Sequence, residues 1–110
     1  MSEALEIKAD VLKERMTARL RLRHLRLLAA LSRCSTLAEA AQEVGVTQPA
    51  ASQALREIEN LLEMPLFERH ARGLRATEAG RLMAEQSDHV LSSVHYAAQA
   101  LAASLTQLRL

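Results

Sequence analysis

The sequence predicts a mainly α-helical fold with one small β-hairpin and a long helix at its end. Aromatic residues make up only 2% of the chain and apolar residues 49%, so Leu, Ala, Val and Ile must form the core, which favours packed helices. Two prolines and three glycines in 110 residues leave long stretches without a helix breaker. The short chain predicts one domain with an appended element.

Residues 1–20 are expected to be an N-terminal extension. Apolar side chains recur there at the spacing of an amphipathic helix: Leu5, Ala9, Leu12, Met16 and Leu20. This helix can pack on the domain, pack on a partner or fray. Residues 19–23 (RLRLR) alternate as a strand would, but no second strand is evident to pair with them. We therefore expect a charged linker or the start of the next helix there.

The next helix is expected from about Arg23 to Arg33. Its inward stripe consists of Leu25, Leu28, Ala29 and Leu31. His24 and Arg26 are expected to face solvent. Cys34 is the single cysteine, with no disulfide partner and no metal-ligand cluster around it, so we expect it to cap or pack the helix end.

Two short helices joined by a tight turn are predicted between residues 36 and 56. Thr36 and Glu39 have the spacing of a capping box, and Gly45 follows the last periodic position, where a left-handed residue ends a helix. Val46 is expected to fill the turn, and Thr47 to cap the second helix. The buried stripe of that helix is expected to be Ala51, Leu55 and Ile58.

The outward face of the second helix carries small, amide and hydroxyl side chains, with no charge before Arg56. Small residues let a helix lie deep in a groove, Gln pairs with adenine edges, and an Ala methyl meets a thymine methyl. We predict a helix-turn-helix whose second helix enters the major groove of DNA. Its DNA-binding residues would be Thr47, Gln48, Pro49, Ala50, Ser52, Gln53 and Arg56. The two-helix pattern alone equally fits an ordinary helical hairpin with a polar face.

The charge distribution supports a nucleic-acid partner more than the net charge of +1 does. Residues 15–81 carry eleven Arg against seven Glu, a balance of +4. Residues 1–14 and 82–110 have balances of −2 and −1. The positive charge thus lies in the segment that holds the predicted recognition helix, as arginines that suit phosphate.

Residues 68–76 are expected to form a small hairpin, the wing of a winged helix, after a turn at Pro65. Phe67 is expected to fill the gap between helices. Arg69, Arg72 and Arg75 would then lie against the DNA backbone or in the minor groove. An internal ion pair is the alternative for Arg69. The winged helix-turn-helix DNA-binding domain would span residues 21–77.

Thr77 is expected to cap a helix from Glu78 to about Leu108, with residues 78–110 forming a linker and dimerisation helix. A heptad-like seam runs along it through Ala84, Leu91, Val94, Ala98, Leu101, Leu105 and Leu108, with Ser87 as its one polar position. A lone helix of this length is marginal, and a small domain cannot cover it, so we predict a homodimer. The dimerisation residues would be Leu91, Val94, Ala98, Leu101, Leu105 and Leu108.

Many positions between Leu25 and Gly80 match a known family pattern at fixed spacing: Leu37, Ala40, Ala41, Val44, Val46, Thr47-Gln48-Pro49-Ala50-Ala51-Ser52, Leu55, Ile58, Glu59, Leu62, Pro65, Leu66-Phe67-Glu68-Arg69, Arg72-Gly73, Thr77 and Ala79-Gly80. On these residues the chain resembles the DNA-binding domain of LysR-type transcriptional regulators. Departures from the pattern are Ser35 and Glu63, where glycine is usual, and Gln53, where some relatives carry arginine.

The resemblance implies a winged helix-turn-helix followed by a dimerising linker helix. It implies that Gln48, Pro49, Ala50, Ser52 and Gln53 face the groove, and that Arg69 and Arg72 contact the backbone. Family members usually continue into a two-lobed domain that senses a small-molecule effector. Because this chain ends at Leu110, we expect that domain to be absent, in an isolated fragment or a naturally short relative.

The sequence offers no enzyme chemistry: it shows no paired carboxylates, no nucleophile beside a base, no metal-ligand spacing and no glycine-rich phosphate loop. No cofactor or metal is expected. No apolar run approaches the ~18 residues of a membrane span, so we expect a cytoplasmic protein. The predicted function is sequence-specific binding of double-stranded DNA by a dimer, at inverted-repeat operators, to regulate transcription. The alternative is a winged-helix protein-interaction or oligomerisation module without DNA binding.

Overall fold

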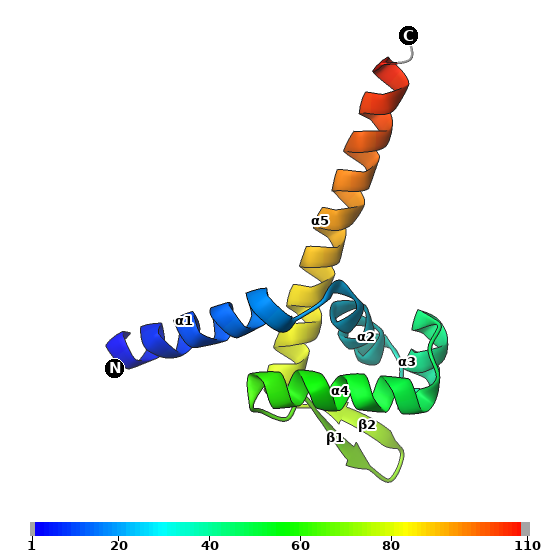
Figure 1. Ribbon diagram of the computed structural model, residues 1–110. Helices are drawn as coiled ribbons and strands as arrows, with labels where there is room; N and C mark the ends of the chain where they lie inside the picture. Colours follow the sequence, from blue (N-terminus) through cyan, green and yellow to red (C-terminus); the bar gives the residue numbers. More distant parts are fainter. Residues whose placement is uncertain (1, 109–110) are drawn as a thin grey trace.

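The computed structural model describes residues 2–108 of the chain. Its elements in order are α1 (Ser2–Arg19), α2 (Leu22–Arg33), α3 (Leu37–Val44), α4 (Gln48–Leu62), β1 (Phe67–His70), β2 (Gly73–Ala76) and α5 (Glu78–Leu108). Helices α2, α3 and α4 form a compact body with the hairpin beneath it, and α1 and α5 extend away from this body (Figure 1). The predicted fold class, a winged helix-turn-helix with a long final helix, is confirmed.

The core lies where α2, α3 and α4 meet. Leu28 of α2, Ala40 of α3 and Ile58 of α4 are completely buried there, and Leu66 closes the core below. Phe67 is buried in the same cluster, as the sequence predicted. Cys34 packs against it at the end of α2. A few aliphatic residues therefore suffice to hold the three helices together.

Local caps set the ends of α3 and α4. The Glu39 backbone N–H donates to Thr36 Oγ1 at 3.1 Å, and the Ala50 N–H donates to Thr47 Oγ1 at 3.2 Å. Gly45 ends α3 with a φ of 78°, in the left-handed region that favours glycine. These caps confirm the predicted helix boundaries. The prediction for Val46 was wrong, because its side chain is 45% exposed and does not fill the turn.

His24 is buried, with 5% of its surface exposed, so its predicted outward orientation was wrong. The reason is that α3, α4 and α5 all pack against α2 and cover most of its circumference. The Arg21 backbone N–H donates to His24 Nδ1 at 3.0 Å and caps α2. His24 Nε2 lies 3.6 Å from the Glu57 carboxylate, too far for a hydrogen bond. Burial, with Arg23 nearby, lowers the pKa of His24 below the usual 6.5.

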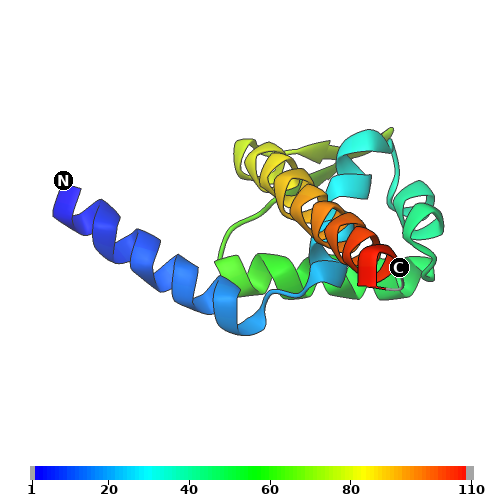
Figure 2. The ribbon, with the colours of Figure 1, turned by 90° about the horizontal axis from the view of Figure 1, so that it is seen from above.

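The N-terminal extension is helical and packs on the domain, and Figure 2 shows α1 leaving the body on one side. Leu12, Met16 and Leu20 pack against the core beside α4, whereas Ala9 is exposed. The side chain of Leu5 lies outside the described part. Only the C-terminal half of α1 is thus shown to use the predicted apolar stripe.

Glu63 ends α4 in the left-handed conformation, with φ 57° and ψ 40°. A side chain at this backbone geometry costs about 1 kcal/mol or more relative to glycine. The Glu63 carboxylate also forms an ion pair with Arg15 of α1, at 3.2 Å. Glu63 therefore provides the left-handed stop for which the sequence resemblance implies a glycine, and it also contacts α1.

Helix α5 is anchored to the body only over its first turns. Thr77 Oγ1 accepts the Gly80 N–H at 3.1 Å, as the predicted cap requires. Ala84 and Ser87 are buried where α5 packs on α2, and the Ser87 hydroxyl donates to the Met83 carbonyl at 2.6 Å. Their assignment to a seam facing a partner was therefore wrong, because α2 already covers them.

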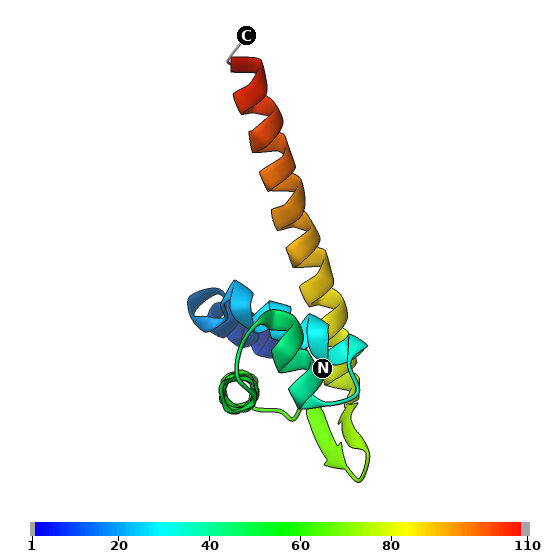
Figure 3. The same ribbon diagram turned by 90° about the vertical axis from the view of Figure 1, so that its right-hand side faces the viewer.

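The hairpin is held under the body by its neighbours. Strands β1 and β2 are antiparallel, with Phe67 opposite Ala76 and His70 opposite Gly73. The Leu74 N–H donates to the Ser35 carbonyl at 3.2 Å. A Cβ at Gly73 would lie 2.3 Å from that carbonyl oxygen, so only glycine allows this approach. Figure 3 views α4 end-on. It shows the hairpin projecting from the end of the body that carries α4, opposite the C-terminal end of α5.

Candidate nucleic-acid interface

The N-terminal half of α4 presents the residues that the sequence predicts for groove contact. Ala51, Leu55 and Ile58 anchor the helix in the core, as predicted. The opposite side then faces solvent, and its exposed members are Thr47, Gln48, Pro49, Ala50, Gln53 and Arg56. Ser52 is half-buried. The packing that builds the core therefore also determines which side chains are available to a ligand.

This exposed surface carries no negative charge near the start of α4. The first turn of the helix contains no acidic residue. At this helix start Pro49 has no N–H and the Ala50 N–H already donates to Thr47, so the Gln48 N–H and the helix dipole are what favour a backbone phosphate here. Arg56 is the first charged residue, and its Nη1 donates to Ser52 Oγ at a long 3.5 Å. The surface combines a weakly positive helix end with neutral hydrogen-bonding groups.

The hairpin adds exposed arginines beside this surface. Arg69, Arg72 and Arg75 are all exposed. Within residues 2–108 none of the three forms an ion pair, so the internal pair considered for Arg69 is not present. Their guanidinium groups remain accessible to an external anion such as a phosphate.

Two hollows join the helix to the hairpin. A hollow of about 170 Å³ between α4 and β1 is lined by Ser52, Arg56 and Arg69, among others. A second hollow, of about 180 Å³, is lined by Gln48, Arg69 and His70 together with the start of α3. Arg69 borders both. Arg69 therefore separates two neighbouring hollows, one lined by Gln48 and the other by Ser52 and Arg56, whereas Arg72 lies outside both.

Glu59 positions the hairpin, a role that sequence analysis missed. Its Oε2 accepts the backbone N–H of Leu66 at 2.6 Å and that of Phe67 at 3.2 Å. Leu66 directly precedes β1 and Phe67 is its first residue, so the carboxylate ties the hairpin to α4. The signal in the sequence was weak, because a half-buried Glu on a surface helix resembles any solvated acid.

The predicted dimerisation residues lie along the part of α5 that extends from the body. Leu91 is half-buried, while Val94, Ala98, Leu101 and Leu105 are exposed. The side chain of Leu108 lies outside the described residues. They share a helix face with Ala84 and Ser87, which α2 covers. The apolar stripe of α5 therefore continues beyond the part that α2 covers.

The described residues offer no other kind of site. Among residues 2–108, no group of three or more His, Cys, Asp or Glu side chains is placed to hold a metal ion. None of the helices described is both long and apolar enough to cross a membrane.

The fold and this surface define a winged helix-turn-helix protein with a long C-terminal helix. Residues 22–81, more than half of the chain, match the family model described as bacterial regulatory helix-turn-helix protein, lysR family. The chain belongs to this lysR family, as the sequence resemblance indicated.

Curated relatives at this level of similarity are transcriptional regulators and not enzymes. The chain is 41% identical over 86 residues to the HTH-type transcriptional regulator GbpR of Azospirillum brasilense, covering 78% of this chain and 25% of GbpR. It is 37% identical over 80 residues to the regulator CbbR of Rhodospirillum rubrum, covering 73% of this chain and 27% of CbbR. The chain thus spans about a quarter of the length of these relatives.

Solved structures of similar proteins include complexes with DNA. A CbnR DBD–DNA complex matches with a TM-score of 0.71 and 26% identity, over 77% of this chain and 98% of that one. A complex of the BenM DBD with catB site 1 DNA matches with a TM-score of 0.68 and 28% identity, over 73% of this chain and 86% of that one.

Proposed function

We propose that this protein binds double-stranded DNA sequence-specifically as a homodimer at inverted-repeat operators and regulates transcription in the cytoplasm. The N-terminal half of α4 enters the major groove, and the hairpin arginines contact the backbone. The observation that carries the proposal is the pair of neighbouring hollows between α4 and the hairpin, lined by Gln48 on one side of Arg69 and by Ser52 and Arg56 on the other. It combines amide and hydroxyl groups that suit base edges with guanidinium groups that suit phosphates.

The position of α5 supports binding as a dimer. Figures 1 and 3 place α4 and the hairpin at one end of the molecule and the C-terminal end of α5 at the other. A second copy packed on Val94, Ala98, Leu101 and Leu105 would therefore leave both recognition surfaces exposed. Two identical surfaces related by a twofold axis suit an inverted repeat.

The proposal is tested by selecting random duplex DNA with the purified protein and sedimenting the same sample with the selected duplex. We expect an enriched inverted repeat with two protomers bound, and an affinity that falls steeply with salt because phosphate contacts release counterions. A folded protein that enriches no sequence would contradict the proposal. It would favour the protein-interaction module, particularly if a salt-insensitive protein complex formed instead.

Two substitutions separate base contacts from phosphate contacts. Gln48→Ala removes a groove-facing amide, so preference at particular base pairs should relax by about 1–3 kcal/mol. Arg72→Ala removes a hairpin charge, so affinity should fall for all sequences alike. The slope of the logarithm of the binding constant against the logarithm of the salt concentration should decrease in magnitude by about 1. Fluorescence anisotropy on the selected duplex and on single-base variants measures both. If Gln48→Ala changed neither affinity nor preference, α4 would not be the recognition helix.

A further inference from the structure

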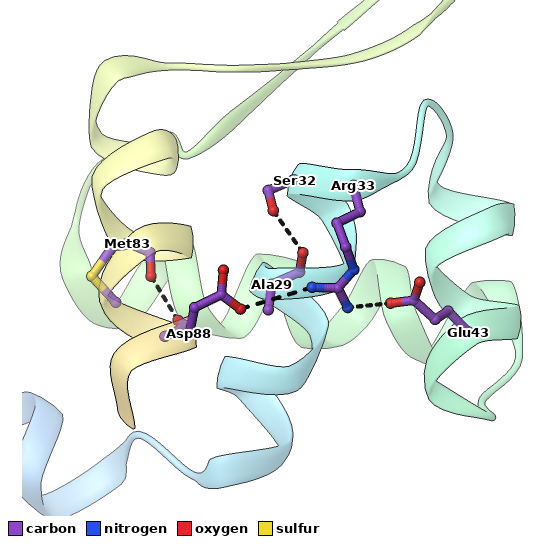
Figure 4. A network of polar contacts seen from close by, with 7 residues as sticks. Ala29, Ser32, Arg33, Glu43, Met83 and Asp88 are labelled. Carbon is purple, nitrogen blue, oxygen red and sulfur yellow. Dashed lines mark hydrogen bonds and ion pairs between the residues drawn. The ribbon is translucent and has the colours of Figure 1, made fainter. Parts of the chain in front are cut away.

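Arg33 joins three helices through one guanidinium group (Figure 4). It lies in the last turn of α2, where Nη2 is 2.5 Å from Glu43 Oε2 in the last turn of α3. Nη1 of the same side chain is 3.8 Å from Asp88 Oδ1 in α5. The first contact is also a hydrogen bond, while the second is a longer ionic contact. One planar group thus connects the helix-turn-helix to the long helix.

The location of the α5 contact makes this connection important. Asp88 directly follows Ser87, the last buried residue of α5 among those described. Beyond Asp88 the helix extends from the body towards its proposed partner. Glu43 stands two residues before Gly45, which begins the turn into α4. Arg33 therefore lies between the point where α5 leaves the body and the turn that presents the recognition helix.

We propose that Arg33 is a positioning residue that holds the helix-turn-helix at a set angle to α5, and so sets the separation between the recognition helices of a dimer. This inference rests on the proposed function. Arginine suits the role because separate nitrogens of its planar fork face the two carboxylates, whereas lysine would have to serve both from a single nitrogen. Each contact is exposed and individually weak, so the expected effect is on geometry more than on folding.

The first experiment measures binding of the dimer to duplexes that carry the selected half-sites at a series of spacings. Arg33→Ala should reduce the preference for the best spacing by about two- to fivefold, the effect expected of a surface ion-pair network. Arg33→Lys should retain part of that preference. Arg26→Ala is the matched control, because Arg26 is an exposed arginine of α2 with no ion pair among the described residues.

A second measurement tests the connection without DNA. Spin labels at Gln42→Cys in α3 and Ser92→Cys in α5, both exposed positions, report the distance between these helices when Cys34 is replaced by Ala. Dilution with unlabelled protein removes distances between protomers. Pulsed electron paramagnetic resonance should give a broader distance distribution for Arg33→Ala than for the control. Glu43→Gln and Asp88→Asn, which each remove one contact, should broaden it less.

The outcomes separate this inference from the function on which it rests. If Arg33→Ala matches Arg26→Ala in either the spacing profile or the distance distribution, the positioning role is wrong while DNA binding stands. If the unaltered protein enriches no DNA, the proposed function fails, and the role in setting the separation fails with it. A broadened distribution together with a relaxed spacing preference would establish the inference.

Discussion

The two halves of α5 share one apolar pattern but meet different surroundings. In the first half, Gly80, Ala84 and Ser87 are buried against the body. In the second half, Val94, Leu101 and Leu105 occupy the same helix face and are exposed, Leu101 by 66%. The residues also differ in size. Gly80, Ala84 and Ser87 are small where the backbone of α5 approaches the body, whereas Val94, Leu101 and Leu105 are larger where the helix is exposed to solvent. A periodic apolar stripe therefore shows which face of a helix packs against another surface, but it does not identify that surface.

The strongest test of the anchored half is Gly80→Val. A Cβ at Gly80 would lie 1.9 Å from the Leu66 carbonyl oxygen, so α5 would have to move away from the turn before β1. We expect the free energy of unfolding to fall by about 3 kcal/mol, measured by urea denaturation. Ala100→Val, on an exposed position of the second half, should cost less than about 1 kcal/mol.

Gly80→Ala makes this test sharper. Gly80 lies in the first turn of α5, and helix propensity alone predicts that alanine stabilises this position relative to glycine, by no more than the roughly 1 kcal/mol found in helix interiors. The close contact predicts the opposite sign. A more stable Gly80→Ala protein would show that α5 does not pack here as described.

The exposed second half of α5 is tested by Leu101→Glu. If a second copy covers this face, the change places a charge in an apolar interface, and the dimer should weaken at least about tenfold. Sedimentation across a concentration series measures this effect. Tyr96→Glu is the control, because Tyr96 is 70% exposed but lies on another face of α5. Equal weakening by both changes would argue against a specific interface along the stripe.

The smallest expected effect concerns α2, which covers the anchored half. The folded-state pKa of His24 is lowered by burial, so the unfolded chain binds the proton more readily. Its contribution to stability is therefore complete well above pH 6.5 and is lost as the pH falls below that value. The slope cannot exceed about 1.4 kcal/mol per pH unit for one proton.

His24→Gln isolates this contribution, because glutamine can still accept the Arg21 N–H at the helix cap. Urea denaturation from pH 8 to pH 5 should show a smaller loss of stability for the variant than for the unaltered protein. Parallel pH profiles for the two proteins would mean that His24 does not titrate differently on folding.

The features predicted correctly from the sequence are mostly local. A cap and the amide it accepts are three residues apart, so Thr36, Thr47 and Thr77 could each be recognised in a short stretch. The buried stripe of α4, and with it the exposed candidate contacts, followed from the helical period alone. The hairpin and its accessible arginines were predicted from a short polar segment around Gly73.

The features that were missed depend on contacts between distant residues. His24 was placed outside because helical periodicity assumes one buried face, whereas three helices surround α2. Ala84 and Ser87 were assigned to a partner because the sequence does not show that α2 reaches them. Glu59 and Arg33 contact residues in other elements, seven or more positions away, which no short motif reveals.

The strained turn at Glu63 has a consequence for any change to the N-terminal helix. The residue that stops α4 is also the residue that Arg15 of α1 pairs with, so a substitution there changes both the turn and one of the contacts that hold α1. Glycine at this position would relax the backbone but remove the carboxylate that meets α1. A shortened variant that lacks α1 would keep the strain and lose this ion pair. Positions 15 and 63 should accordingly be altered together.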